Sequence, residues 1–231
     1  MPEPVADGGG VKAAAEALKS FGDLIKPFTD PVFSQLGEYV ADKIRFLRIK
    51  NSVRVLVRAR EILRDNGLDP VPVEAKILVA VLEGAGLEEE NELVERWSRL
   101  LASAGAGAKI PPSFPVVLGQ LLPDDGRVLD LLLEHLLREV KGGWPPGPLY
   151  LGITGREVRK NLGLGNPAFM FSVVNLIRLG LVAKTSTLIG GTLEMAYDHD
   201  GYALTFFGGE FVKACRGPTS LGRNPEVVGG S

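Results

Sequence analysis

Side chains that could support catalysis or bind a metal are few in this sequence of 231 residues. The histidines are His135 and His199, and the one cysteine is Cys215. His135 lies in a leucine-rich stretch beside Glu134, and His199 lies within Asp198–Asp200, a run typical of a turn between strands. A zinc site needs three or four ligands around one point, and a catalytic histidine needs a partner and a cleft. The sequence therefore predicts no metal site and no catalytic centre.

Other motifs for cofactors or metals are weak too. Gly163-Leu164-Gly165 is too short for a dinucleotide fingerprint and follows a predicted helix rather than a strand. Glu88, Glu89 and Glu90 could bind a metal, but consecutive helical residues point in different directions. We expect these acids in the first turn of a helix over 87–104, where the helix dipole favours negative charge. Cys215 is typical of a buried core cysteine. We therefore expect no cofactor and no enzymatic activity.

The strongest charged feature is a basic stretch within a long helix predicted over 31–66. Residues 43–64 contain eight cationic side chains and one acidic side chain, whereas residues 69–96 contain eight acids and two cations. The two segments can pack with complementary charged rims, or the basic side chains can contact the phosphates of a nucleic acid. The candidate surface for a polyanion or another partner comprises Lys43, Arg45, Arg48, Lys50, Arg54 and Arg58.

The elements that position these residues are predicted to be mainly helical. A disordered leader over 1–10 precedes a helical domain over 11–141. Residues 11–28 form an amphipathic helix, because apolar residues recur at spacings of three and four. The residues on this apolar face are Ala14, Leu18, Phe21, Leu24, Ile25 and Phe28. Further helices are predicted over 73–84, 87–104, 114–122 and 124–141, and Asp124 is expected to cap the last of them. The glycine- and proline-rich run 142–148 predicts the domain boundary.

After this run, the pattern of elements over 148–216 predicts a winged helix, and residues 217–231 a flexible tail. A helix over 154–162 begins with a capping box of Thr154 and Glu157, and a second helix runs from Pro167 to Leu179. A hairpin of 181–189 and 192–197, a strand over 202–205 and a helix over 206–216 follow. The second helix carries one charge, Arg178, whereas helices that read the major groove usually carry several cationic or amide side chains.

Composition restricts the class of protein further. The 26 Lys and Arg residues against 28 Asp and Glu residues give a net charge of -2, which disfavours non-specific coating of nucleic acid. A single cysteine fits a reducing compartment, and no apolar run reaches the roughly 18 residues of a membrane span. The start of the chain lacks the basic region of a secretory signal. We therefore expect a cytoplasmic protein.

Several stretches resemble the abortive-infection alpha (Abi-alpha) family of bacterial proteins. These are the basic helix at 36–73, the stretch at 76–104 with its WSRLLA-type ending, IPPSFPVVLGQLLPDDGRVLDLL at 110–132, VVNLIRLGLV at 173–182 and YALTFFGGEFVKAC at 202–215. They cover nearly all of 30–216, in order. The resemblance implies a role in defence against bacteriophage, in which an infected cell stops growing or dies. It implies no particular molecular activity and no catalytic residues.

The resemblance and the missing catalytic groups favour a phage-defence protein that works by binding. Its partner would be a protein, either a phage or host component or a second copy of the chain. The alternative is a nucleic-acid-binding regulator that uses the basic residues of 43–64 and the winged helix. A third hypothesis is a toxin that acts at the membrane surface through residues 11–28, whose lysines and phenylalanines suit an interface.

Overall fold

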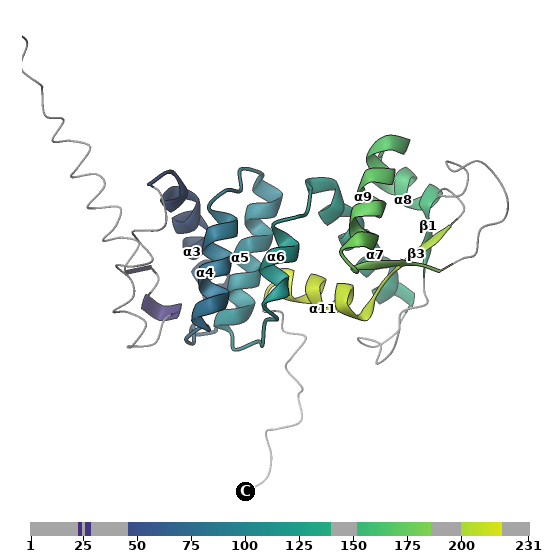
Figure 1. Cartoon of the computed structure of the whole chain (residues 1–231). Helices are drawn as coiled ribbons and strands as arrows, with labels where there is room; N and C mark the ends of the chain where they lie inside the picture. The colour runs from purple at the N-terminus through teal and green to yellow at the C-terminus, as the bar shows by residue number, and fades with distance from the viewer. Residues whose placement is uncertain (1–22, 25, 29–45, 140–151, 186–199, 219–231) are drawn as a thin grey trace, which may run out of the picture. The chain divides into compact units, whose positions relative to one another are not determined.

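The computed structural model describes residues 23–24, 26–28, 46–139, 152–185 and 200–218. Within these ranges the chain is mainly helical and contains a small three-stranded antiparallel sheet (Figure 1), which confirms the predicted class. The chain forms two compact units. Unit 1 comprises residues 1–116 together with 216–231, and unit 2 comprises residues 117–215. The boundary lies within the short helix α6 (Ser113–Leu118).

Unit 1 is built around three helices that lie side by side (Figure 1). They are α3 (Phe46–Asp65), α4 (Ala75–Ala85) and α5 (Asn91–Gly105), and a short 3-10 helix, η1 (Lys26–Phe28), precedes them. Each helix buries an apolar stripe, and the indole of Trp97 lies in the core directly against Gly84. A Cβ atom at Gly84 would lie 2.4 Å from the Trp97 ring, so the packing of α4 on α5 depends on this glycine.

Local signals explain where the helices of unit 1 end and begin. Gly67 adopts a φ of 66°, and the amide of Leu68 donates to the carbonyl of Leu63 in a Schellman motif that ends α3. The predicted end of the basic helix is thereby confirmed. The expectation for the three glutamates was wrong, because α5 begins only at Asn91. The Glu88 carboxylate instead accepts hydrogen bonds from the amides of Glu89 and Glu90, which holds a turn ahead of the helix.

Unit 2 packs its helices around a leucine-rich helix and the small sheet. Its sheet has the order β1-β3-β2, with antiparallel pairs such as Ile153–Tyr202 and Val182–Leu204. Phe169 meets Tyr202 edge-on in the core, with 5.8 Å between ring centroids. The elements are α7 (Pro123–Glu139), β1 (Ile153–Thr154), α8 (Gly155–Leu162), α9 (Asn166–Arg178), β2 (Val182–Lys184), β3 (Gly201–Leu204) and α11 (Phe206–Cys215).

The division into units differs from the predicted boundary at 142–148. Helix α7 lies in unit 2, not in the N-terminal domain, because its leucine-rich face packs against α8, α9, β3 and α11. Leu129, Leu132 and Leu136 of this face are buried. A run rich in glycine and proline indicates an interruption of regular secondary structure. It does not show which elements pack against the helix that precedes the run. The run 142–148 lies outside the described residues.

Other predictions for unit 2 have mixed outcomes. The capping box that begins α8 is confirmed, since the Thr154 hydroxyl accepts from the Glu157 amide and the Glu157 carboxylate accepts from the Thr154 amide. Strand β1 was not predicted, because two residues carry too little periodicity. Strand β2 pairs with β3, and the predicted partner 192–197 lies outside the described residues. The leader 1–10, the part of the helix 31–66 before Phe46 and nearly all of the tail 217–231 also lie outside them.

Candidate interaction surfaces

The basic stretch lies on α3, whose inner face packs against α4 and α5. Lys43 and Arg45 lie outside the described residues, and Arg48 occupies the first turn of α3. Lys50 and Arg54 are exposed, and Arg58 is half-buried. The six candidate residues therefore differ in their surroundings, and the two that have described polar contacts are Arg54 and Arg58.

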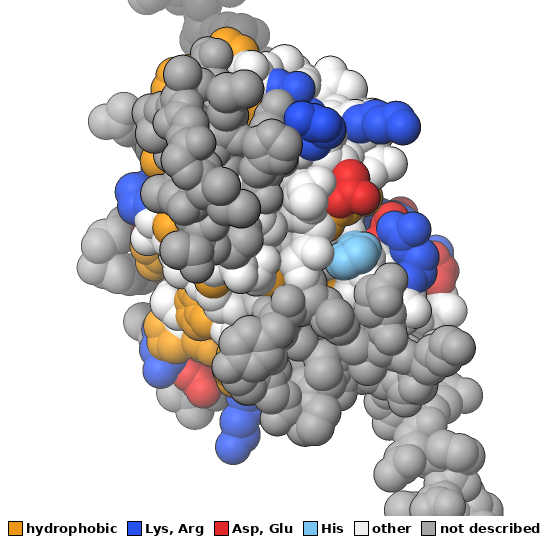
Figure 2. All heavy atoms as spheres, turned by 90° about the vertical axis from the view of Figure 1, so that its right-hand side faces the viewer, with side chains coloured by type: hydrophobic (Ala, Val, Ile, Leu, Met, Phe, Trp, Pro, Cys, Tyr) orange, Lys and Arg blue, Asp and Glu red, His pale blue; other side chains and the backbone are white. Residues whose placement is uncertain are grey.

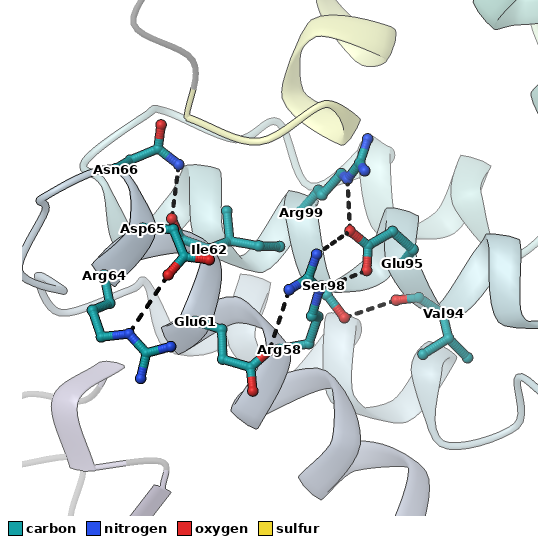
Figure 3. Close-up of polar contacts among 10 residues, drawn as sticks. All are labelled: Arg58, Glu61, Ile62, Arg64, Asp65, Asn66, Val94, Glu95, Ser98 and Arg99. Atoms are coloured by element: carbon teal, nitrogen blue, oxygen red, sulfur yellow. Dashed lines mark hydrogen bonds and ion pairs between the residues drawn. The ribbon is translucent and has the colours of Figure 1, made fainter.

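Arg58 joins α3 to α5 through the acidic segment (Figure 3). Its Nε and Nη2 atoms donate to the two carboxylate oxygens of Glu95 at 2.9 and 3.1 Å, and its Nη1 donates to Glu61 at 3.2 Å. Arg99 donates to the same Glu95 carboxylate at 3.0 Å. This two-pronged geometry is the strongest form of an arginine–carboxylate contact. The expected pairing of the basic helix with the acidic segment is confirmed at this point.

The electrostatics of this cluster follow from its hydrogen bonds. The bond from Arg58 is the main reason that the pKa of Glu95 lies below its ordinary value, and the bond from Arg99 adds to it. The pKa of Arg58 is raised above its ordinary value, chiefly by its hydrogen bond to Glu95 and then by its bond to Glu61. Glu95 therefore stays negative and Arg58 positive near neutral pH. The Arg58 charge is matched within the chain, which weakens its availability to an outside phosphate.

Two further hydrogen bonds join α3 to the start of α5, and their acceptors are neutral groups. Arg54 donates to the Asn91 side-chain carbonyl at 2.7 Å, at the first residue of α5. One turn earlier on α3, Asn51 donates to the backbone carbonyl of Glu88 at 3.0 Å. Polar side chains of α3 thus hold the turn before α5 and its first residues. Lys50, Arg60 and Arg64 are also exposed on this helix, and Arg64 pairs with the neighbouring Asp65 at 3.6 Å.

Unit 2 contains a second polar cluster, which sequence reasoning missed. The Asp125 carboxylate is fully buried and accepts hydrogen bonds from the Ser172 hydroxyl, the Asn175 amide and the backbone amide of Leu122. Asn175 also donates to the Gln120 carbonyl at 3.0 Å. We predicted Asp124 as the cap of this helix, but Asp124 pairs with Arg127 instead. The buried cluster fixes α9 to the start of α7.

The outward face of α9 is apolar. Phe171 is 74% exposed and Val174 is 47% exposed, and the exposed Pro167 precedes them at helical spacing. The single charge of the helix, Arg178, donates to the Asn175 and Gln120 side chains. From the sequence, we expected Trp97, Trp144, Phe169 and Phe171 to anchor the packing of the helical domain on the winged helix. The structure buries Phe169 in the core and leaves Phe171 on the surface.

Charges of both signs are mixed on the face shown in Figure 2. Among its coloured side chains, Lys and Arg form small separate groups with Asp or Glu beside some of them, and hydrophobic side chains emerge between these groups. A surface that tracks a nucleic-acid backbone usually has a continuous basic stripe. The coloured part of this face lacks such a stripe.

The residues considered for metal binding or catalysis lie partly within the described ranges. His135 is half-buried on α7 and Cys215 is buried, whereas Asp198 and His199 lie outside the described residues. Asp200 is buried and pairs with Lys184 across the β2–β3 pair. No group of three or more His, Cys, Asp or Glu side chains suited to a metal occurs within the described ranges. None of the helices in these ranges combines the length and hydropathy that crossing a bilayer requires.

Comparison with known proteins agrees with the resemblance seen in the sequence. The model of the family described as abortive infection alpha matches residues 48–215, which span both units. No curated protein and no solved structure matches the chain. The match covers more than half of the sequence and includes α3, the acidic segment and the elements of unit 2 from α7 to α11. The chain therefore belongs to the abortive infection alpha family.

Proposed function

We propose that this protein acts in abortive infection by binding a protein partner, not by catalysis, through the outward face of α9. The observation that carries this proposal is the exposure of Phe171 and Val174 on a helix that is otherwise well fixed. Large apolar side chains on a rigid helix are the anchors that protein interfaces favour. Family membership supports the biological role, in which an infected cell stops growing or dies.

A winged helix is the fold that we assign to unit 2 in this proposal. Support comes from the chain order β1, α8, α9, β2, β3 and from the antiparallel order β1-β3-β2 of the sheet. In this assignment α9 takes the place of the helix that enters the major groove in DNA-binding relatives of the fold. Its exposed apolar side chains and its one engaged arginine suit a protein surface better than a groove of base edges.

The test compares a variant of the α9 face with a control variant that makes the same kind of change elsewhere on unit 2. Phe171→Glu with Val174→Glu places two charges on the α9 face, whereas Phe206→Glu places one on a residue of unit 2 that is 63% exposed. We expect the α9 variant to lose about tenfold or more of the protection of cells against phage, as a hot-spot residue would. We also expect that a protein that co-purifies with the native chain no longer co-purifies with the α9 variant. The control variant should keep both.

A thermal melt of each variant separates loss of binding from loss of folding, since surface substitutions of this kind change stability little. Full protection by the α9 double variant, at unchanged stability, would contradict the proposal. An enzymatic role would become the better explanation if a substitution of a polar side chain away from α9 abolished protection while the co-purifying protein stayed bound.

The nucleic-acid-binding alternative keeps one observation in its favour, the exposure of Lys50, Arg60 and Arg64 on α3. Charge reversal at Arg58 is a poor test of it, because that change also breaks the pair with Glu95. Lys50→Glu with Arg60→Glu is cleaner. If this variant lost both co-purifying nucleic acid and protection against phage, the nucleic-acid-binding hypothesis would replace the proposed binding of a protein partner.

A further inference from the structure

A groove runs along the outer face of α3 in unit 1. Two adjoining hollows of about 620 and 340 Å³ share Val57 and Glu61 in their walls, so they form one continuous depression. The larger hollow continues past the end of α3 to Leu68 and Pro70. The smaller one reaches Asn91 and Val94 of α5. The groove therefore follows α3 from about Arg54 to the Schellman turn at its end.

The groove combines an apolar floor with charged rims. Val57 on α3 and Leu68 in the turn after α3 are each 38% exposed, and both line the larger hollow. Arg60 and Arg64 stand on the rim and are exposed. This pattern is typical of a groove that receives the apolar face of an amphipathic helix.

One described residue of the N-terminal stretch already lies in this groove. Leu24, half-buried, lines the larger hollow together with Val57 and Leu68. In the sequence, Leu24 belongs to the same apolar face as Ala14, Leu18 and Phe21, at helical spacing. The eleven residues from Ala14 to Leu24 would extend about 15 Å as a helix, which equals the rise of α3 from Arg54 to Arg64. The apolar pattern of the stretch therefore suits the groove, and its length covers the part of the groove that runs along α3.

We propose that residues 11–24 dock through their apolar face into the α3 groove of the same chain. The docked segment covers the apolar floor that Val57 and Leu68 form on unit 1. This surface is separate from the α9 face and does not depend on it. A free N-terminal segment that inserts into a membrane is the competing outcome.

The test measures how fast a thiol in the groove reacts with N-ethylmaleimide. Val57→Cys is prepared in the full chain, in a chain without residues 1–22, and in a full chain that carries Leu18→Glu with Phe21→Glu. We expect the full chain to react about tenfold more slowly than the other two, because the docked segment must open before the thiol is reached. The unmodified chain gives the background rate of Cys215, which is 1% exposed.

Three controls make the result specific. Leu87→Cys, on a residue of unit 1 that is 65% exposed and outside the groove, should react equally fast with and without residues 1–22. The pair Lys12→Glu with Lys19→Glu changes the polar side of the stretch. In this background the thiol of Val57→Cys should still react slowly. The rate should not change with protein concentration, which distinguishes docking within one chain from docking between two copies.

Equal reaction rates of Val57→Cys with and without residues 1–22 would overturn the proposal. Arg60→Cys, on the groove rim, repeats the measurement if Val57→Cys fails to fold. Anionic vesicles test the competing outcome. If they pulled down the full chain through residues 1–28 while Val57→Cys reacted equally fast with and without residues 1–22, the stretch would be a membrane-binding segment instead.

Discussion

At the scale of single residues, the clearest electrostatic feature is Glu95 between two guanidinium groups. Arg58 and Arg99 both donate to its carboxylate, and the helix pair α3 and α5 is joined there. Such a pair is partly solvated, so its contribution to stability is modest. The pH dependence of this contribution tests the contact better than its magnitude does, because the pKa of Glu95 is lowered in the folded chain.

We predict that Glu95→Gln lowers the free energy of unfolding by about 1 kcal/mol near neutral pH. A carboxyl with a lowered pKa stabilises the folded chain at pH values above its ordinary pKa of 4.5, and this contribution is lost as the pH falls through the lower folded value. The difference between Glu95→Gln and the native chain should therefore shrink on acidification below pH 4.5. Urea unfolding across a pH series measures it.

The exposed Glu89 provides the matched control for this substitution. Glu89→Gln makes the same chemical change in the turn before α5 and should leave the free energy of unfolding nearly unchanged. If Glu95→Gln and Glu89→Gln had equal effects at neutral pH, the Arg58–Glu95 contact would contribute nothing to the packing of α3 on α5.

At the scale of elements, the orientation of α9 depends on a buried carboxylate more than on the local sequence of the helix. Asp125 receives three hydrogen bonds, and two of them come from α9 itself. Removing the carboxylate takes the acceptor from the buried Ser172 hydroxyl, which costs more than losing a surface contact. The face that presents Phe171 and Val174 is held in place by this cluster.

We predict that Asp125→Ala lowers the free energy of unfolding of unit 2 by about 2 kcal/mol, because the buried Ser172 hydroxyl and two part-buried donors lose this acceptor. Asp124→Ala, one residue earlier, removes a half-exposed pair with Arg127 and should cost less than about 1 kcal/mol. Thermal or urea unfolding, followed by a signal confined to unit 2, compares the two. Equal losses for the neighbouring aspartates would show that the buried cluster does not hold α9.

The helix ends show what the sequence could predict and where it failed. Gly67 and the Thr154–Glu157 box are local signals, because the residues that make the contacts lie within a few positions of one another. The Asp125 cluster joins residues almost fifty positions apart, and Arg58 meets Glu95 across 37 positions. Periodicity and composition do not encode such pairings, so the wrong aspartate was chosen as the cap. The difference between the predicted boundary at 142–148 and the division into two compact units has the same origin.

The α9 face was only half predicted for a related reason. Phe169 and Phe171 are two residues apart on one helix, so they point in different directions, yet aromatic content alone made them appear equivalent. Packing against Tyr202 selects Phe169 for the core. The low charge of α9, by contrast, was visible in the sequence, and it already indicated that this helix is poorly suited to read DNA.

At the scale of the whole molecule, charge balance bears on whether the partner is a protein or a nucleic acid. The chain has 26 cationic against 28 acidic residues, and the half-buried Arg58 is paired with Glu95. Each phosphate contact changes the logarithm of the binding constant by about -0.9 per logarithmic unit of salt. If Lys50, Arg60 and Arg64 all contacted duplex phosphates, the salt slope would be about -2.7.

We predict instead that the chain does not bind a duplex of random sequence with a salt slope this steep. The measurement follows the anisotropy of a fluorescent duplex over a series of salt concentrations. Lys50, Arg60 and Arg64, on a chain of net negative charge, give too little attraction to retain a duplex at physiological salt. Lys50→Glu with Arg60→Glu should therefore leave the result unchanged. A slope near -2.7 in the native chain that falls to about -0.9 in this variant would establish phosphate contacts on α3. That result would make the basic helix, not the apolar face of α9, the primary surface through which this protein acts.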